Sequence, residues 1–362
     1  MTRLLVVGWI NSPHVYEWAE EFQKRGFEVH LAGEEDPGLP PADPPAAAGL
    51  HRFEASGPPG TRARRMAGDL GELAAELAPD LTHAHWLTSF GWMAAKAGLH
   101  PLVVSAWGSD VFRVRAATRR RSRTALEAAD AVMADSRALA QAAALLAPDA
   151  PEPEVVNWGV DPGRFTPGDA AAARERVGIE PGGPVVMGIR GLATHYNPAA
   201  LLRGFAALRE EVPEARLVLK HPHDELPVEI GAAIQKHAIE DCVRVVGHVD
   251  GAELADWYRA AEVCVSIPST DSSPRSVWEA LACARPLVVS DLPWAREWLE
   301  DGREALLVPP RPESVGDALL SLLRQPELAA RLAEGGHALA TERMSRDTEM
   351  QRAEEVYRRL LT

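Results

Sequence analysis

The chain has 362 residues, of which 46% are hydrophobic and 25% are charged. This is the composition of an ordinary soluble globular protein, and it excludes wholesale disorder, a collagen-like repeat and a membrane-embedded bundle. At roughly 150 residues per domain, the length predicts about two domains. The 52 acidic residues outnumber the 38 basic ones, so the net charge is -14. Nucleic acid is therefore disfavoured as a partner, because binding to a phosphate backbone requires a net basic face.

The cysteines and the N-terminal residues indicate the cellular compartment in which the protein is expected. Three cysteines, none of them in a CxxC pair, indicate a reducing environment without a disulfide framework or structural zinc. The apolar residues 4–10 superficially resemble a short signal sequence, but no small-residue cleavage site follows them. We interpret them as a buried first strand and expect a cytoplasmic protein.

The first part of the chain alternates between strand and helix patterns. The continuous apolar run Leu4–Val7 is typical of a parallel strand covered on both faces. Residues 36–60 contain seven prolines and are expected to form a long loop. Further strands, with helices between them, are expected at Phe27–Leu31, Leu81–His85, Leu102–Ser105, Ala131–Ala134 and Glu154–Val156.

A second series of strands follows a cluster of glycines and prolines at 157–169. These strands are expected at Val185–Ile189, Arg216–Leu219, Val243–Val246, Val263–Ser266, Leu287–Ser290 and Leu306–Val308. Such alternation predicts an α/β fold of two facing Rossmann-like domains with parallel sheets, covering residues 1–158 and 159–340. A charged terminal helix within 341–362 must pack on a domain already built. Ligands are expected in the cleft at the carboxyl ends of the strands.

The segment 268–286 carries the clearest chemical pattern. It follows a strand and opens a helix, so that free backbone N–H groups at the helix start favour a phosphate or diphosphate. Asp271 lies in the loop and Glu279 about one turn into the helix, so the two carboxylates reach different parts of one ligand. Carboxylates accept hydrogen bonds from vicinal hydroxyls, which suits a sugar at one end and a ribose at the other. The other residues expected to bind this ligand are Ser272, Ser273, Arg275, Ser276 and Val277. The alternative is a capping aspartate and a solvated glutamate on an ordinary helix.

This segment resembles the acid-x7-acid signature of retaining GT-B glycosyltransferases of family 4. Residues 279–289, EALACARPLVV, resemble the family's continuation EAMACGxPVV, and residues 159–167 resemble its interdomain linker GVDxxRFxP. Residues 291–293, 301–302 and 307–310 are similar to its closing loops. The resemblance runs from the first strand to the last helix. It implies an N-terminal acceptor domain, a C-terminal donor domain and a terminal helix that returns to the first domain.

The sequence departs from the family pattern at several positions. Asp271 replaces the usual glutamate and Ala284 the usual glycine. The family neutralises the donor diphosphate with an arginine and a lysine five residues apart; here Arg190 is present, but His195 takes the lysine position. Arg190 can clamp phosphate oxygens, and a neighbouring diphosphate would favour the charged form of His195. Both residues are otherwise expected to be ordinary surface side chains.

Two further residues of the second domain are expected to bind the same ligand, and a third feature resembles a metal site. Lys220 ends a strand and can supply the missing positive charge, and His248 lies where family members line the nucleobase pocket. The cluster of His221, His223 and Asp224 resembles a metal site, but no further ligand set is spaced to complete it. We therefore expect no metal.

In the first domain, His83 and His85 end a strand and alternate onto the same face. A shared metal, a core position and a cleft position remain open, and the resemblance favours His85 in the cleft near the sugar. Asp110 is expected either to orient the acceptor or to cap a helix. The loop after the first strand lacks the family's glycine pair, so that Asn11 or His14 is expected to line the acceptor side.

These observations predict a metal-independent, retaining transfer of a sugar from a nucleotide diphosphate sugar to an unidentified small-molecule, glycan or lipid acceptor. Uridine diphosphate is the commonest family choice. The resemblance implies a front-face mechanism in which a diphosphate oxygen takes the acceptor proton. The alternatives are a sugar-nucleotide epimerase or hydrolase on the same fold and a noncatalytic sugar-nucleotide-binding protein. A dinucleotide oxidoreductase is disfavoured because no GxGxxG follows either first strand.

Basic residues are concentrated in two places on this acidic chain. Six arginines lie between Arg113 and Arg123, and Arg62, Arg64 and Arg65 form a smaller group. They can contact an anionic membrane from the inner face or hold a phosphate-bearing acceptor. The alternative is a solvated helix face.

Overall fold

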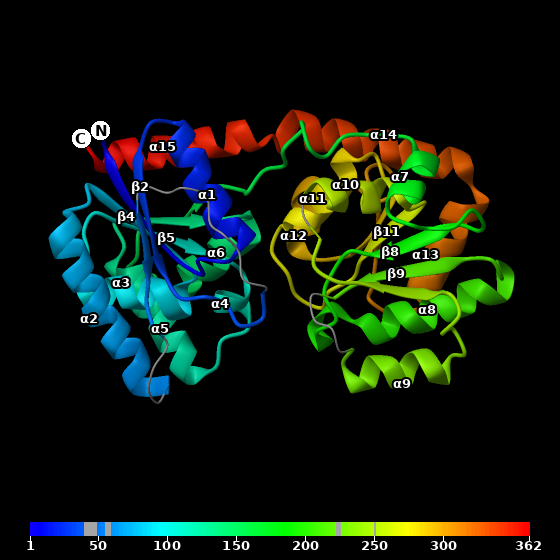
Figure 1. The fold of residues 1–362 in the computed structure, drawn as a ribbon, viewed down its shortest axis with the longest axis horizontal. Coiled ribbons are helices and arrows are strands. Elements are labelled where there is room, and N and C mark those ends of the chain that lie inside the picture. The colour runs from blue at the N-terminus through cyan, green and yellow to red at the C-terminus, as the bar shows by residue number, and fades with distance from the viewer. Residues whose placement is uncertain (40–48, 55–58, 222–225, 250) are drawn as a thin grey trace. The chain divides into compact units, whose positions relative to one another are not determined.

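The structure is a computed structural model that describes residues 1–39, 49–54, 59–221, 226–249 and 251–362. The chain forms two compact units: unit 1 consists of Met1–Trp158 and Glu349–Thr362, and unit 2 of Gly159–Thr348. Each unit is built on one parallel sheet with helices on its faces (Figure 1). The chain thus re-enters unit 1 at Glu349, whereas the sequence-based division placed the start of the terminal segment at 341.

Unit 1 contains a seven-stranded parallel sheet in the order β3-β2-β1-β4-β5-β6-β7. Its strands are β1 (Arg3–Val7), β2 (Glu28–Gly33), β3 (Gly49–Arg52), β4 (Leu81–His85), β5 (Leu102–Ala106), β6 (Ala131–Ala134) and β7 (Glu154–Val155). Its helices are α1 (Pro13–Lys24), α2 (Pro59–Leu77), α3 (Trp92–Ala97), α4 (Ser109–Phe112), α5 (Ala116–Ala128), α6 (Arg137–Leu146) and α15 (Arg346–Leu360), with a π-helical turn η1 (Leu87–Gly91) before α3.

The apolar run in β1 supplies side chains to two cores. Leu5 and Val7 pack with residues of α2, α3, α5 and α6. Leu4 and Val6, which alternate with them, pack with residues of α1 and α15 on the other face. A strand that is buried on both faces needs a continuous apolar run, and this explains why β1 shows no polar alternation.

The expectation of a loop throughout 36–60 is wrong, because β3 lies within it. This strand pairs in parallel with β2, and its residues Gly49, Leu50, His51 and Arg52 are half-buried or exposed. It is an edge strand with one neighbour, so its sequence carries neither an apolar run nor a clear alternation. The sheet of unit 1 therefore has one strand more than the sequence predicted.

The C-terminal helix α15 packs on unit 1 beside α1 (Figure 1). Trp18 Nε1 donates a hydrogen bond of 2.8 Å to the Tyr357 hydroxyl, and Arg25 forms an ion pair with Glu354 at 3.2 Å. Tyr357 is fully buried. The charged helix thus packs through one row of buried residues, which includes Tyr357. The expected return of the terminal helix to the first domain is confirmed.

Unit 2 contains a six-stranded parallel sheet in the order β10-β9-β8-β11-β12-β13. Its strands are β8 (Val185–Gly188), β9 (Arg216–Lys220), β10 (Val243–Val246), β11 (Val263–Ser266), β12 (Leu287–Ser290) and β13 (Leu306–Val308). Its helices are α7 (Ala170–Arg176), α8 (Pro198–Glu211), α9 (Val228–Lys236), α10 (Gly251–Ala260), α11 (Arg275–Ala282), α12 (Pro293–Trp298), α13 (Pro312–Arg324) and α14 (Pro326–Arg343), with a 3-10 turn η2 (Thr194–Tyr196).

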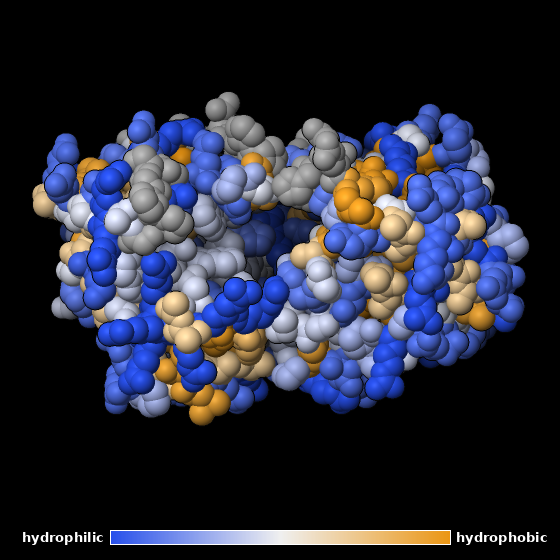
Figure 2. Space-filling model, turned by 90° about the horizontal axis from the view of Figure 1, so that it is seen from below, coloured by the Kyte–Doolittle hydropathy of each residue, from blue (hydrophilic) through white to orange (hydrophobic). Residues whose placement is uncertain are grey.

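The surface is mixed in polarity. Figure 2 shows hydrophilic residues over much of the face that it presents, with hydrophobic residues in smaller groups between them. Among the described residues, none of the helices combines the length and the apolarity that a bilayer span requires.

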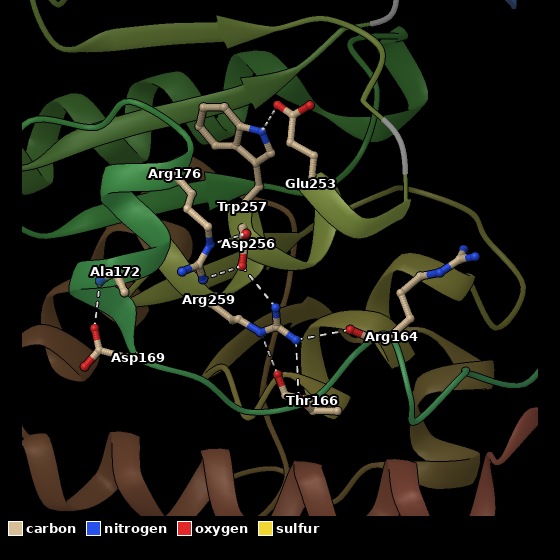
Figure 3. Close-up of polar contacts among 9 residues, drawn as sticks. All are labelled: Arg164, Thr166, Asp169, Ala172, Arg176, Glu253, Asp256, Trp257 and Arg259. Carbon is tan, nitrogen blue, oxygen red and sulfur yellow. Dashed lines mark hydrogen bonds and ion pairs between the residues drawn. The ribbon is translucent and has the colours of Figure 1, made fainter.

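The segment before α7, which contains Arg164 and Thr166, is hydrogen-bonded to α10 (Figure 3). Arg259 donates hydrogen bonds to the carbonyl oxygens of Thr166 at 2.9 Å and Arg164 at 3.1 Å. Its guanidinium also pairs with Asp256 at 3.0 Å, and Asp256 accepts two hydrogen bonds from Arg176. One arginine thus connects the linker, α10 and α7.

The two segments that connect the units are hydrogen-bonded to each other. The N–H of Val160 donates to the carbonyl of Met344 at 2.7 Å, and the N–H of Arg346 donates to the carbonyl of Val160 at 3.0 Å. Gly159 has φ +65°, and a Cβ at this position would lie 2.4 Å from the Cα of Arg346. A side chain at residue 159 would therefore push these segments apart.

We expect Gly159→Ala to destabilise unit 2 more than Gly178→Ala. Both glycines have φ +65°, so both substitutions carry the same backbone strain of about 1 kcal/mol. A Cβ at residue 178 meets no atom closer than 3.9 Å, whereas at residue 159 it collides with backbone. Denaturant unfolding should show a loss at least ~2 kcal/mol larger for Gly159→Ala. Equal losses would show that the close approach relaxes freely.

Candidate functional site

Arg190 and Asp271 meet where the strand order of unit 2 reverses. They follow β8 and β11, which are neighbours in the sheet although their outgoing connections run in opposite directions. Such a reversal leaves a crevice at the carboxyl ends of the strands. Arg190 Nη2 lies 2.7 Å from Asp271 Oδ2, and Arg190 Nη1 donates to Ser276 Oγ at 3.1 Å. The guanidinium also lies 4.6 Å above the centre of the Tyr196 ring.

Glu279 lies in α11 and is almost fully buried. Its Oε2 accepts a hydrogen bond of 2.9 Å from the Tyr258 hydroxyl, and its Oε1 lies 2.8 Å from Arg275 Nε. The side chains of Arg275 and Glu279 are each 6% exposed. A buried carboxylate with a cation and a hydroxyl beside it is held in one orientation.

Lys220 completes a group of charges in the same region of unit 2. Burial lowers the pKa of Lys220, the charge of Glu279 raises it, and the charges of Arg190 and Arg275 lower it. Burial raises the pKa of Asp271, while Arg190 acts in the opposite direction. Three cations and two carboxylates therefore interact with one another.

The turn before α11 and the first residues of this helix are held by hydrogen bonds and by burial. The N–H of Ser272 donates to Asp271 Oδ1 at 3.0 Å, and the indole Nε1 of Trp278 donates to Ser273 Oγ at 3.0 Å. Ser273 has φ +26°, which is uncommon for a residue with a side chain. Val277 is fully buried. Backbone strain of this kind occurs where the surroundings over-determine a turn, often at a binding site.

The two histidines expected near the donor lie in different settings. His195 forms part of η2, where its ring packs against that of Tyr196 at 3.9 Å and its carbonyl accepts a hydrogen bond of 2.8 Å from the N–H of Ser269. His248 is exposed after β10. The ring of Tyr196 thus contacts both His195 and the guanidinium of Arg190.

The structure describes only part of the expected metal-like cluster. His221 is buried, and His223 and Asp224 lie outside the described residues. Among the residues that are described, there is no group of three or more His, Cys, Asp or Glu side chains that could hold a metal ion.

In unit 1, His85 lies in an aromatic box at the carboxyl end of β4, which neighbours β1. Its ring centre lies 5.3 Å from Trp18, 5.9 Å from Trp107 and 5.6 Å from Trp158. His85 is fully buried, and neither of its ring nitrogens nor Trp107 Nε1 has a hydrogen-bond partner among the described residues. Burial and the charge of His14 lower the pKa of His85 to about 3. The imidazole is therefore neutral at physiological pH.

His83 has a structural position. Its Nδ1 contacts the Tyr357 hydroxyl and its Nε2 lies 2.7 Å from Ser105 Oγ, so both ring nitrogens are occupied. The ring centres of His83 and His85 are 4.1 Å apart. Because His83 has no nitrogen left for a ligand, the hypothesis of a metal shared by the two histidines has no support in this geometry.

Asp110 and Asn11 hold loops at the same edge of the sheet. Asp110 accepts hydrogen bonds from the N–H groups of Leu87 at 2.8 Å and Trp107 at 2.9 Å, and burial raises its pKa to about 6. Asn11 exchanges two hydrogen bonds with the backbone of Asp36. Both carboxylate oxygens of Asp110 are thus used to position backbone, including that of Trp107 in the aromatic box.

Sequence analysis missed two tyrosines that shape the site of unit 2. Tyr258 orients Glu279, and Tyr196 supports Arg190. Tyr258 lies in α10 beside the buried residues Ala255 and Trp257. The apolar pattern of this helix could have predicted that Tyr258 is buried, and a buried tyrosine hydroxyl usually has a hydrogen-bond partner. Nothing in the local sequence distinguishes Tyr196.

Family models and curated relatives match the chain. A model described as "Glycosyl transferase 4-like" matches residues 3–136, and one described as "Glycosyl transferases group 1" matches residues 184–325. The chain is 30% identical to D-inositol 3-phosphate glycosyltransferase 2 of Catenulispora acidiphila, over 89% of this chain and 83% of that protein. It is 31% identical to D-inositol 3-phosphate glycosyltransferase of Actinosynnema mirum, over 90% and 87% respectively.

Solved structures share the fold at low identity. Anabaena HepE, solved in complex with UDP-glucose, has a TM-score of 0.83 at 17% identity, and sucrose-phosphate synthase from Thermosynechococcus elongatus has a TM-score of 0.81 at 18% identity. Both alignments cover 99% of each chain. The predicted GT-B fold is therefore confirmed. Together with the family models and the curated relatives, the fold identifies this chain as a member of the family 4-type, group 1 glycosyltransferases, and hence as a transferase enzyme.

Proposed function

We propose that the enzyme transfers a sugar from a UDP-sugar to a hydroxyl group of an acceptor, with retention of configuration and without a metal ion. The observation that carries the proposal is the interaction of Arg190, Lys220, Asp271 and Glu279 at the carboxyl ends of β8, β9 and β11 and in α11. The solved complex of Anabaena HepE with UDP-glucose supports this choice of donor.

The cations of this group suit a diphosphate. Arg190 presents a planar fork of donors that matches phosphate oxygens, and its orientation is held by Asp271, Ser276 and Tyr196. Lys220 supplies the second charge, in place of the lysine that family members carry at the position of His195. The first backbone N–H groups of α11 add a helix N-terminus. His195 then acts by packing against Tyr196.

The carboxylates suit hydroxyl groups at the two ends of the donor. Glu279 is anchored through Tyr258 and Arg275. Asp271 pairs with Arg190 in the free protein, and a bound diphosphate would share this guanidinium. Binding of the donor thus redistributes hydrogen bonds that already exist, and little reorganisation is needed.

The reaction then needs no protein base. The bond from the anomeric carbon to the diphosphate oxygen breaks as the acceptor oxygen attacks from the same face. The acceptor proton passes to an oxygen of the leaving diphosphate, which takes the electron pair of the broken bond. Arg190, Lys220 and the start of α11 stabilise the negative charge that develops on this diphosphate.

The acceptor side of the proposal rests on the aromatic box of unit 1. The neutral imidazole of His85 and the indole Nε1 of Trp107 are buried polar groups without a partner among the described residues, and such groups are costly unless a ligand or water satisfies them. Aromatic walls with a few hydrogen-bonding groups suit a polyhydroxylated ring. Because the curated relatives are named for D-inositol 3-phosphate, this compound is the first acceptor to test.

We expect Lys220→Met to weaken UDP binding at least tenfold at neutral pH. Because burial lowers the pKa of Lys220, its ammonium loses the proton at lower pH than that of an ordinary lysine. The affinity of the wild type should therefore fall as the pH rises, at a pH below the ordinary range of lysine, and this fall should be absent in Lys220→Met. Calorimetric titration with UDP checks both effects.

The matched control for this titration is Lys236→Met, because Lys236 is an exposed lysine of the same unit. Its UDP affinity and its pH dependence should equal those of the wild type. An unchanged affinity in Lys220→Met would remove Lys220 from the proposed site.

We expect Asp271→Asn and Glu279→Gln each to lower the rate of sugar transfer from UDP-glucose to D-inositol 3-phosphate at least a hundredfold, which corresponds to about 2.7 kcal/mol of transition-state stabilisation. Glu313→Gln, at a surface carboxylate that is 71% exposed, should leave the rate unchanged. The measurement is UDP release with product analysis by NMR.

The same assay tests the metal independence, the stereochemistry and the transfer to an acceptor. EDTA should not lower the rate, and the product should keep the anomeric configuration of the donor. Inversion would contradict the retaining mechanism. Free glucose with no glycosylated product, across a panel of acceptors, would instead favour the hydrolase.

A further inference from the structure

The helices α2, α3 and α5 of unit 1 surround a cavity of about 760 Å³. This volume lies within the range of small-molecule sites, about 300–1,000 Å³. The lining residues are Thr61, Arg64, Trp92, Lys96, Ala117, Arg120, Arg121 and Thr124. They belong to unit 1, whereas the residues of the proposed donor site belong to unit 2.

The cavity is basic and its charges are uncompensated. Arg64, Lys96, Arg120 and Arg121 all line it, and none of the four forms an ion pair with a carboxylate of any described residue. The neighbouring Arg123, which does not line the cavity, pairs with Glu127 at 2.6 Å. On a chain of net charge -14, four like charges around one hollow form a local positive potential that attracts anions.

One of the four cations, Arg121, is held in place by the fold, whereas Arg64, Lys96 and Arg120 are exposed. The guanidinium of Arg121 lies 4.7 Å above the ring centre of Trp92, and Trp92 itself is 9% exposed. This stacking fixes the plane of the guanidinium and leaves its N–H groups free for a ligand. Thr61 and Ala117 lie in the first turns of α2 and α5, so two helix N-termini add positive potential to the cavity.

We propose that this cavity is a binding site for a phosphate-bearing ligand. Phosphate oxygens match the guanidinium forks of Arg120 and Arg121, and Arg64 and Lys96 supply charge from the opposite helices. The ligand can be a soluble phosphorylated compound or the headgroup of an anionic lipid, since both present the same group. The site is distinct from the proposed donor site and from the aromatic box around His85, because none of the residues that line it belongs to either.

The test compares two double variants of equal charge. Arg120→Gln/Arg121→Gln removes two cations of the cavity, and Arg113→Gln/Arg119→Gln removes two exposed arginines of the same region that do not line it. Inorganic pyrophosphate is titrated into the full chain by calorimetry. With Arg190→Gln added to each protein, so that the proposed donor site does not bind the probe, the cavity variant should bind at least tenfold more weakly than Arg190→Gln alone, equivalent to about 1.4 kcal/mol, and the control should bind as Arg190→Gln alone does.

A third variant separates this proposal from the proposed function. Arg190→Gln should lose UDP binding and keep the pyrophosphate binding that depends on Arg120 and Arg121. If all the pyrophosphate binding disappears with Arg190→Gln, the ion binds in unit 2 and the cavity proposal is overturned. Equal weakening in the two double variants would also overturn it, since general surface charge would then explain the binding. Thermal unfolding of each variant checks that the fold is intact.

Sedimentation with vesicles distinguishes the two sources of phosphate. If vesicles of phosphatidylglycerol retain the wild type and the control variant but not the cavity variant, while phosphatidylcholine retains none, the phosphate belongs to a lipid headgroup. If pyrophosphate binds as expected and no vesicle retains the protein, the ligand is soluble. If neither probe distinguishes the cavity variant from the control, the proposal is wrong.

Discussion

The reversal of strand order within each parallel sheet is the constraint on which both candidate sites depend. In unit 2 it lies between β8 and β11, and in unit 1 between β1 and β4. On either side of such a reversal the outgoing connections run in opposite directions, so no helix covers the space between the strand ends. Arg190 and Asp271 occupy this position in unit 2, and His85 occupies it in unit 1. Residues far apart in sequence are brought together because the topology leaves this place open.

The two sites solve the problem of buried polar groups differently. In unit 2 the buried groups are charged, and two pairs of them balance each other, Arg190 with Asp271 and Arg275 with Glu279, while Lys220 adds a third cation. Removing one partner from such a pair leaves an uncompensated charge, which is strongly destabilising. In unit 1 the box around His85 is aromatic, and burial keeps the imidazole neutral. A charged site suits a diphosphate, and a neutral aromatic one suits a polyhydroxylated acceptor.

Local patterns predicted most of the sheets. The run Leu4–Val7 and the four inner strands of unit 2 were found because strands buried on both faces need apolar residues at nearly every position, and the edge strands β10 and β13 were found because they keep short apolar runs. The edge strand β3 was missed because it has a neighbour on one side only and carries no such run. The positions of Asp271 and Glu279 relative to α11 also followed from sequence. Their partners Tyr196 and Tyr258 did not, since they come from elements whose proximity depends on the order of strands.

The two groups of arginines, at 62–65 and 113–123, were also predicted in part from sequence and in part only from the tertiary structure. Their number and their spacing were evident from the chain, because composition and periodicity are local properties. That Arg64 from one group and Arg120 and Arg121 from the other line a single cavity, with Lys96 and Trp92 between them, depended on the packing of α2, α3 and α5. The sequence thus determined which elements form and which charges they carry. Only tertiary structure decided which of these charges share one space, because helix packing joins residues that no local pattern connects.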